Sequence, residues 1–167
     1  CSFQIIDHKG NKVPDMRDPV LLHAHCNVKN EMLIKNVIGP PCCVLARREC
    51  FLKVGSFDQN LAGPEDRDMW LRICNEYAMQ FIREVLCGVR VHDRNAQKNV
   101  PKMKENQLKF IMKHKSSYEY LMCRKAYGFV YLDAAREYNL AGQRYSALVN
   151  SFMSILMYPF QIDPFDK

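Results

Sequence analysis

The chain has 167 residues, of which 48% are hydrophobic and 25% are charged, and its net charge is +6. This composition is typical of a globular protein, and no stretch of about 18 consecutive apolar residues predicts a membrane span. Lys and Arg are scattered along the chain rather than interleaved with aromatic residues, so a nucleic-acid partner is not expected.

The eight cysteines follow no familiar ligand or disulfide spacing. Cys42 and Cys43 are adjacent, Cys74 falls on an apolar helix face, and no Cys-x-x-Cys pair of the kind used by zinc sites occurs. We therefore expect free, mostly buried thiols and a cytoplasmic location. The chain begins with Cys1 rather than Met, so we expect either a fragment or a processed form of a longer protein.

The first half alternates short strands and helices. A strand over 2–6 is followed by a turn in which Gly10 takes a positive φ, and a helix over 30–35 is ended by Gly39, Pro40 and Pro41. The apolar run 42–46 predicts a buried strand, and 47–54 predicts a helix ending at Gly55. Two further strands are expected over 79–86 and 88–92.

A helix that opens on Pro64 and two carboxylates, Glu65 and Asp66, is the most informative segment. Its apolar face is predicted at the i, i+3, i+4, i+7 positions Trp70, Ile73, Cys74 and Tyr77. Asp66 precedes Trp70 by four residues and should therefore face the protein body or a cleft beside it. Simple capping of the helix start by the two acids is the alternative.

Two further expectations concern the charges of this helix. Asp68, Arg72 and Glu76 have i, i+4 spacing on the opposite face, which predicts a solvated charge ladder. The helix dipole at the N-terminus is expected to lower the pKa of Asp66.

The last third of the chain is predicted to be helical from Pro101. Ser116 and Glu119 have the spacing of a capping box. Apolar stripes at helical spacing predict two packed helices separated at 139–142: Tyr120, Cys123, Tyr127, Tyr131, Ala134 and Tyr138, then Tyr145, Leu148, Val149, Phe152, Ile155 and Leu156. Two helices with a short break form a helical hairpin.

The string Gly55-x-Phe57-Asp58, a short loop, then Glu65-Asp66-x-Asp68-x-Trp70-x-Arg72 resembles the acceptor-side signature of family 2 glycosyltransferases. These are inverting enzymes of the GT-A fold, and the resemblance runs from about Ser2 to Asn99. It implies an α/β fold, in which residues 1–100 form the acceptor-side half of a partial GT-A domain. That domain is Rossmann-like with a mixed sheet, and residues 101–167 add a C-terminal α-helical extension with a helical hairpin.

The resemblance also implies roles for individual residues. Asp66 would be the general base, and Glu65 would orient it or hold the acceptor. Gly39, Trp70, Arg72 and Arg90 would bind acceptor or substrate, although the place of Trp70 in the apolar stripe favours core packing, and Arg72 could instead be a partner behind the site or a surface residue. His92, in the string Arg90-Val91-His92, would help to hold a divalent cation, Mn²⁺ or Mg²⁺, at the donor diphosphate.

The implied partners are a nucleotide-sugar donor and a sugar or glycoconjugate acceptor. The donor-binding half, with its acidic metal motif, would precede Cys1, so the 167 residues alone are expected to be inactive. Two alternatives remain open: a non-catalytic binding or scaffolding module of the same fold, and a helical-repeat interaction protein in which the hairpin is the working part.

Overall fold

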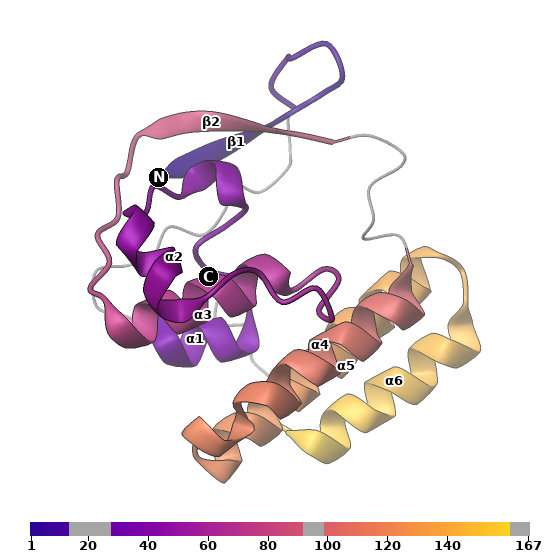
Figure 1. The fold of residues 1–167 in the computed structure, drawn as a ribbon. Helices are drawn as coiled ribbons and strands as arrows, with labels where there is room; N and C mark the ends of the chain where they lie inside the picture. Colours follow the sequence, from indigo (N-terminus) through magenta and orange to yellow (C-terminus); the bar gives the residue numbers. More distant parts are fainter. Residues whose placement is uncertain (14–27, 92–98, 161–167) are drawn as a thin grey trace. The chain divides into compact units, whose positions relative to one another are not determined.

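The computed structural model describes residues 1–13, 28–91 and 99–160 (Figure 1). Contacts divide the chain into two compact units. Unit 1 comprises Cys1–Asp58 and Glu65–Lys98, and unit 2 comprises Gln59–Pro64 and Asn99–Lys167. The assignment of residues 1–100 and 101–167 to an acceptor-side half and a helical extension stays a prediction.

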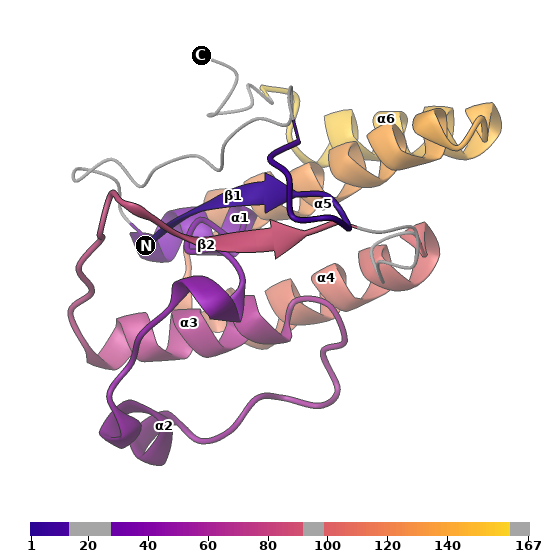
Figure 2. The same ribbon diagram turned by 90° about the horizontal axis from the view of Figure 1, so that it is seen from above.

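Unit 1 contains a parallel pair of strands, β1 (Ser2–Ile6) and β2 (Val85–Arg90), which run in the same direction in Figure 2. The strand over 2–6 and the positive φ of Gly10 are confirmed. Two strands were predicted over 79–86 and 88–92, but the described residues form one strand, β2, which includes the end of the first prediction and part of the second. The Ser2 backbone N–H bonds to the carbonyls of Ile82 and Glu84, and the strand pairing begins at Ser2 and Val85, so residues 79–84 precede the ladder.

The described part of unit 1 also contains the α-helices α1 (Val28–Ile34), α2 (Arg48–Val54) and α3 (Glu65–Glu76). α1 packs on α3, and the two helices supply the core residues Met32, Leu33, Ile34, Met69, Trp70, Leu71 and Ile73. The expected apolar face of α3 is confirmed, since Trp70, Ile73 and Cys74 are buried. Gly55 ends α2 with φ of 85°, as its position in the sequence predicts.

The buried strand predicted over 42–46 is wrong. Residues Pro41–Cys43 form a short 3-10 helix, η1, and Leu45 is fully exposed. Pro40 and Pro41 explain the difference, because both lack a backbone N–H and Pro41 favours the first position of a helical turn.

Unit 2 contains α4 (Val100–His114), the 3-10 helix η3 (Lys115–Ser117), α5 (Tyr120–Leu140) and α6 (Arg144–Met157). The hairpin is confirmed: α5 and α6 pack side by side, joined by a three-residue break with Gly142 at φ of 74° (Figure 1). The capping box is wrong, because Ser116 and Ser117 belong to η3 and Glu119 caps α5 without a side-chain hydrogen bond.

The apolar stripe of α6, which was predicted to pack against the neighbouring helix, is exposed instead. Leu148, Phe152 and Ile155 are 70%, 65% and 61% exposed, and Tyr145, Val149 and Leu156 are also exposed. The buried residues of α6 are the smaller Ala147, Asn150 and Ser154. Ala147 packs with Ala134 and Tyr138 of α5, and small residues permit this close approach of the two helices.

The described residues thus form a mixed α/β structure with a small parallel sheet and a helical hairpin, and a GT-A domain stays a prediction. Within the described ranges, each helix is too short or too polar to cross a bilayer.

Candidate functional site

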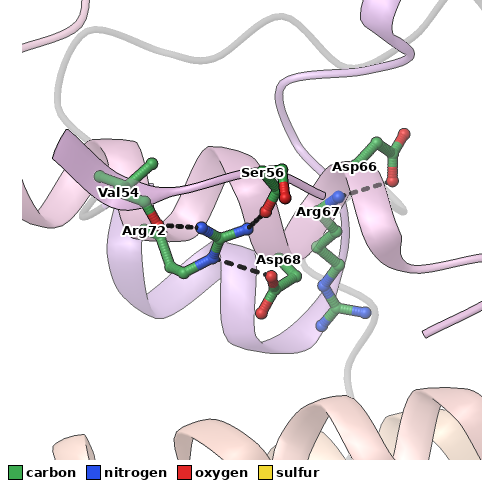
Figure 3. A network of polar contacts seen from close by, with 6 residues as sticks. All are labelled: Val54, Ser56, Asp66, Arg67, Asp68 and Arg72. Carbon is green, nitrogen blue, oxygen red and sulfur yellow. Dashed lines mark hydrogen bonds and ion pairs between the residues drawn. The ribbon is translucent and has the colours of Figure 1, made fainter. Parts of the chain in front are cut away.

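Asp66 lies in the first turn of α3 and is half-buried. Its Oδ1 accepts a hydrogen bond from the backbone N–H of Arg67 at 2.6 Å, and its Oδ2 accepts one from Asn36 Nδ2 at 3.2 Å (Figure 3 shows the first). The side chain therefore faces the 36–39 loop of unit 1, which agrees with the orientation expected from its spacing to Trp70.

Burial raises the pKa of Asp66 from 3.8 to about 6, and the neighbouring charge of Glu65 adds to the rise while the Arg67 backbone N–H opposes it. The expectation that the helix start lowers this pKa is wrong. After allowance for partial exposure, a rise of this size corresponds to about 1–2 kcal/mol, whereas a helix dipole contributes about 0.3–1 kcal/mol at an exposed site. Desolvation therefore outweighs the dipole.

Asn36 joins Asp66 to the turn that ends at Gly39. Its Oδ1 accepts hydrogen bonds from the backbone N–H groups of Ile38 and Gly39 at 3.2 and 3.0 Å, and its Nδ2 also donates to the Gly39 carbonyl at 3.3 Å. Asn36 is not among the site residues predicted from the sequence. The signal was an Asn three residues before a Gly, since Asn side chains commonly bond to the backbone a few residues ahead.

Gly39 and Trp70, two of the predicted substrate-binding residues, meet at the same place. Trp70 Nε1 donates to the Gly39 carbonyl at 3.2 Å, while its ring is 3% exposed and makes an edge contact with Phe57. Gly39 has φ of 99°, and a Cβ there would lie 3.1 Å from the Phe3 ring. The structure therefore brings Asp66, Gly39 and Trp70 together around Asn36, with the Trp70 ring in the core.

Arg72 lies elsewhere on α3 and holds the chain that follows α2. Its guanidinium donates to Asp68 Oδ2 at 2.9 Å, to the Val54 carbonyl at 2.5 Å and to the Ser56 carbonyl at 2.9 Å (Figure 3). The substrate-binding role expected of Arg72 stays a prediction, and these contacts give the residue a structural task.

The predicted solvated ladder is wrong at Asp68, whose side chain is fully buried. The residues after α2 are drawn onto α3 because the last carbonyls of a helix need donors from outside it, and Arg72 supplies one to Val54. Glu76 does lie at the surface, where it pairs with Lys53 at 3.6 Å.

Arg90 ends β2 and is exposed. Its Nη1 donates to the Asp7 carbonyl at 2.6 Å, and the Asp7 carboxylate in turn accepts from the backbone N–H groups of Lys9 and Asn11. Arg90 thus ties down the turn after β1 at the carboxyl end of the strands, the edge where parallel sheets usually bind ligands.

His92, the predicted cation ligand, lies outside the described residues. Within the described ranges, the one cluster of three or more potential ligands among His, Cys, Asp and Glu side chains consists of Cys42, Cys43 and Cys87. Mn²⁺ and Mg²⁺ prefer oxygen ligands over sulfur, so this cluster does not fit the expected cation.

Comparison with known proteins gives partial similarities to curated sequences. An uncharacterised glycosyltransferase of Rickettsia conorii is 27% identical over 99 residues, covering 59% of this chain and 16% of that protein. One of Rickettsia typhi is 29% identical, covering 56% of this chain and 29% of that protein. A Rickettsia felis counterpart is 25% identical over 99 residues. No family model matches the chain, and no solved structure matches it significantly.

The chain spans less than a third of the length of each of the R. conorii and R. typhi relatives. These relatives carry the name glycosyltransferase without a described activity. The chain thus has distant similarity, over somewhat more than half of its length, to uncharacterised Rickettsia glycosyltransferases.

Proposed function

We propose that this chain forms the acceptor side of an inverting glycosyltransferase of the family 2, GT-A type, and that Asp66 is its general base. The observation that carries the proposal is the environment of Asp66: a half-buried carboxylate, held by Asn36 beside Gly39 and Trp70, with its pKa raised to about 6. The similarity to named glycosyltransferases supports the same class of reaction.

A carboxylate with this pKa suits the abstraction of a proton from a hydroxyl group. At pH 7 it is about nine-tenths ionised, yet it is a stronger base than an ordinary Asp, and general bases work best when their pKa is near the operating pH. In the proposed step the acceptor O–H bond breaks and the proton passes to Asp66. The acceptor oxygen then attacks the anomeric carbon, and the nucleotide diphosphate leaves from the opposite face.

Other side chains have supporting tasks in this proposal. Asn36 Nδ2 binds Asp66 Oδ2 and leaves Oδ1 to the backbone of Arg67, which limits rotation of the carboxylate. Glu65 raises the pKa of Asp66 by charge repulsion and is adjacent to it at the helix start. A donor-site Mn²⁺ or Mg²⁺, held in part by His92, belongs to the same proposal and would neutralise charge on the leaving diphosphate.

The test is a substitution in the full-length protein that contains this chain. Release of nucleoside diphosphate from a panel of nucleotide sugars, with sugar and glycoconjugate acceptors, measures turnover, while donor affinity is measured by calorimetry. Asp66→Asn is expected to lower kcat by about 10²–10⁴ with donor affinity retained.

The matched control is Glu76→Gln, which removes a carboxylate from the same helix where it forms an exposed ion pair with Lys53. It should leave kcat unchanged. Full turnover by Asp66→Asn would refute the assignment of the base. A wild-type protein that binds sugars without turnover would instead favour the non-catalytic module.

A further inference from the structure

Three cysteine sulfur atoms meet at the surface of unit 1. The Sγ atoms of Cys43 and Cys87 are 3.5 Å apart, those of Cys42 and Cys43 are 3.9 Å apart, and all three lie within 4.8 Å of one another. Cys87 is 44 residues from Cys43 in the sequence, so folding, rather than local spacing, assembles this group.

The separations match those of sulfur ligands around one metal ion. Four ligands at a Zn–S distance of about 2.3 Å form a tetrahedron whose edges are ~3.8 Å long. The two separations of 3.5 and 3.9 Å lie on either side of that edge. A disulfide would require two sulfurs to approach to about 2.05 Å and would leave the third thiol unused.

The backbone around the cluster favours a fixed arrangement. Cys42 and Cys43 lie in η1, which Pro40 and Pro41 introduce and in which the Cys43 N–H bonds to the Pro40 carbonyl at 2.9 Å. Cys87 is held on β2 opposite Phe3 of β1. Cys43 is buried, Cys87 is half-buried and Cys42 is exposed, so an ion can reach the sulfurs from solvent on the Cys42 side.

We propose that Cys42, Cys43 and Cys87 bind one Zn²⁺ ion as thiolates, with a water molecule in the fourth position. Each thiol loses its proton to solvent, three Zn–S bonds form, and waters of the hydrated ion are displaced. The hydrogen bond from the Cys87 thiol to the Cys42 carbonyl is given up in the exchange. Thiolates select soft or borderline ions such as Zn²⁺ over Mg²⁺ and Mn²⁺, so this site is distinct from the proposed donor cation and does not depend on sugar transfer.

Such an ion would join two segments that bear on the candidate site. It would link η1 to β2, and η1 directly follows the 36–39 turn. A Cβ built on Gly39 would lie 3.8 Å from Cys43 Sγ, so the cluster borders the residue whose carbonyl holds Trp70. The zinc would therefore hold η1 and β2 together next to the turn at Gly39.

The experiment is a metal titration of the 167-residue chain under reducing conditions. Zn²⁺ is titrated against a chromophoric chelator, and Co²⁺ is used as a spectroscopic substitute that shows thiolate-to-cobalt charge-transfer absorption. The expected result is one ion per chain and a charge-transfer band. Cys87→Ser and Cys42→Ser should each weaken binding more than ~100-fold, because even loss of an outer-shell partner weakens metal sites about 10–100-fold.

Cys123→Ser is the matched control, since Cys123 lies on α5 in unit 2 and its thiol contacts the Lys115 carbonyl. It should bind zinc with unchanged affinity. Circular dichroism shows whether each variant is folded, and exposed Cys42 provides a variant with little effect on packing. The proposal is overturned if no charge-transfer band appears, or if Cys42→Ser and Cys87→Ser bind zinc as tightly as the wild type does. It is also overturned if the folded chain forms a disulfide in air and binds no metal when reduced.

Discussion

Replacement of Arg72 by Ala should destabilise unit 1 far more than loss of a neighbouring ion pair. Arg72 makes three hydrogen bonds, to the Asp68 carboxylate and to the carbonyls of Val54 and Ser56. Its side chain is 20% exposed and that of Asp68 is fully buried. The guanidinium therefore neutralises a buried charge and also fastens the end of α2 to α3.

The size of the effect follows from burial. Removal of one partner from a buried ion pair destabilises a protein by about 3–5 kcal/mol, because the other charge stays buried. Partial exposure of Arg72 places the expected loss near the lower end, about 3 kcal/mol. The Lys53–Glu76 pair joins the same two helices at the surface, with side chains 61% and 46% exposed, and exposed pairs contribute less than about 1 kcal/mol.

Trp70, the single tryptophan in the sequence, lies on α3 and reports the unfolding of unit 1 by fluorescence. For Arg72→Ala we expect the urea midpoint to fall by roughly 1–3 M, since small proteins lose about 1–3 kcal/mol of stability per molar urea. Lys53→Ala should shift it much less. Equal shifts for the two variants would refute the reasoning, as would strict additivity of Arg72→Ala and Asp68→Asn in a double-mutant cycle.

Three further predictions concern the surroundings of Asp66. The pKa of Asp66 is about 6 in the folded chain against 3.8 normally, so the folded state holds its proton more tightly and stability should fall as pH rises from about 4 to 6. Asp66→Asn should accordingly be more stable than the wild type above pH 6, by about 1–2 kcal/mol after allowance for partial exposure, and an unchanged urea midpoint at pH 7.5 would contradict this. Gly39→Ala should destabilise unit 1 by about 1–3 kcal/mol more than Gly10→Ala, because both have positive φ but only Gly39 has an atom of Phe3 within 4 Å of the added Cβ; equal thermal shifts would count against the steric argument. Asn36→Ala should cost about 1–3 kcal/mol through the polar backbone groups it leaves without a partner, and amide exchange at Gly39 should accelerate; unchanged protection there would contradict the role given to Asn36.

Features set by local chemistry were predictable from the sequence. Gly10 and Gly55 stand where the chain needs positive φ, and the spacing along α3 correctly places Trp70 and Ile73 in the core. The direction of Asp66 also follows from that spacing, because helical periodicity fixes which residues share a face.

Features set by distant parts of the chain were not predictable in this way. Asp68 looks like a surface residue in a helical projection, but it is fully buried and pairs with Arg72, which also binds the carbonyls of Val54 and Ser56. The pKa of Asp66 depends on burial by surroundings that periodicity does not describe. Likewise, the spacing of cysteines along the sequence does not predict the thiol cluster, because Cys87 on β2 comes next to η1 only when the chain folds.

The stripe on α6 shows a different limit. Leu148, Phe152 and Ile155 recur at helical spacing, which correctly predicts a helix. Periodicity does not say which side of that helix its neighbour takes, and in the hairpin α5 lies against the side that carries Ala147.

The parallel pairing of β1 with β2 has a consequence for how the chain acquires its structure. Phe3 pairs with Cys87 and Ile6 with Arg90, so the two strands can pair only when the ends of a very long chain loop come together. In contrast, α5 and α6 are separated by only three residues. Long closures lose more chain entropy and slow the search for the native state. We therefore expect the α5–α6 hairpin to form early and quickly, and pairing of β1 with β2 to be the slow step in the folding of unit 1. During synthesis, β1 cannot pair with β2 until β2 has been made.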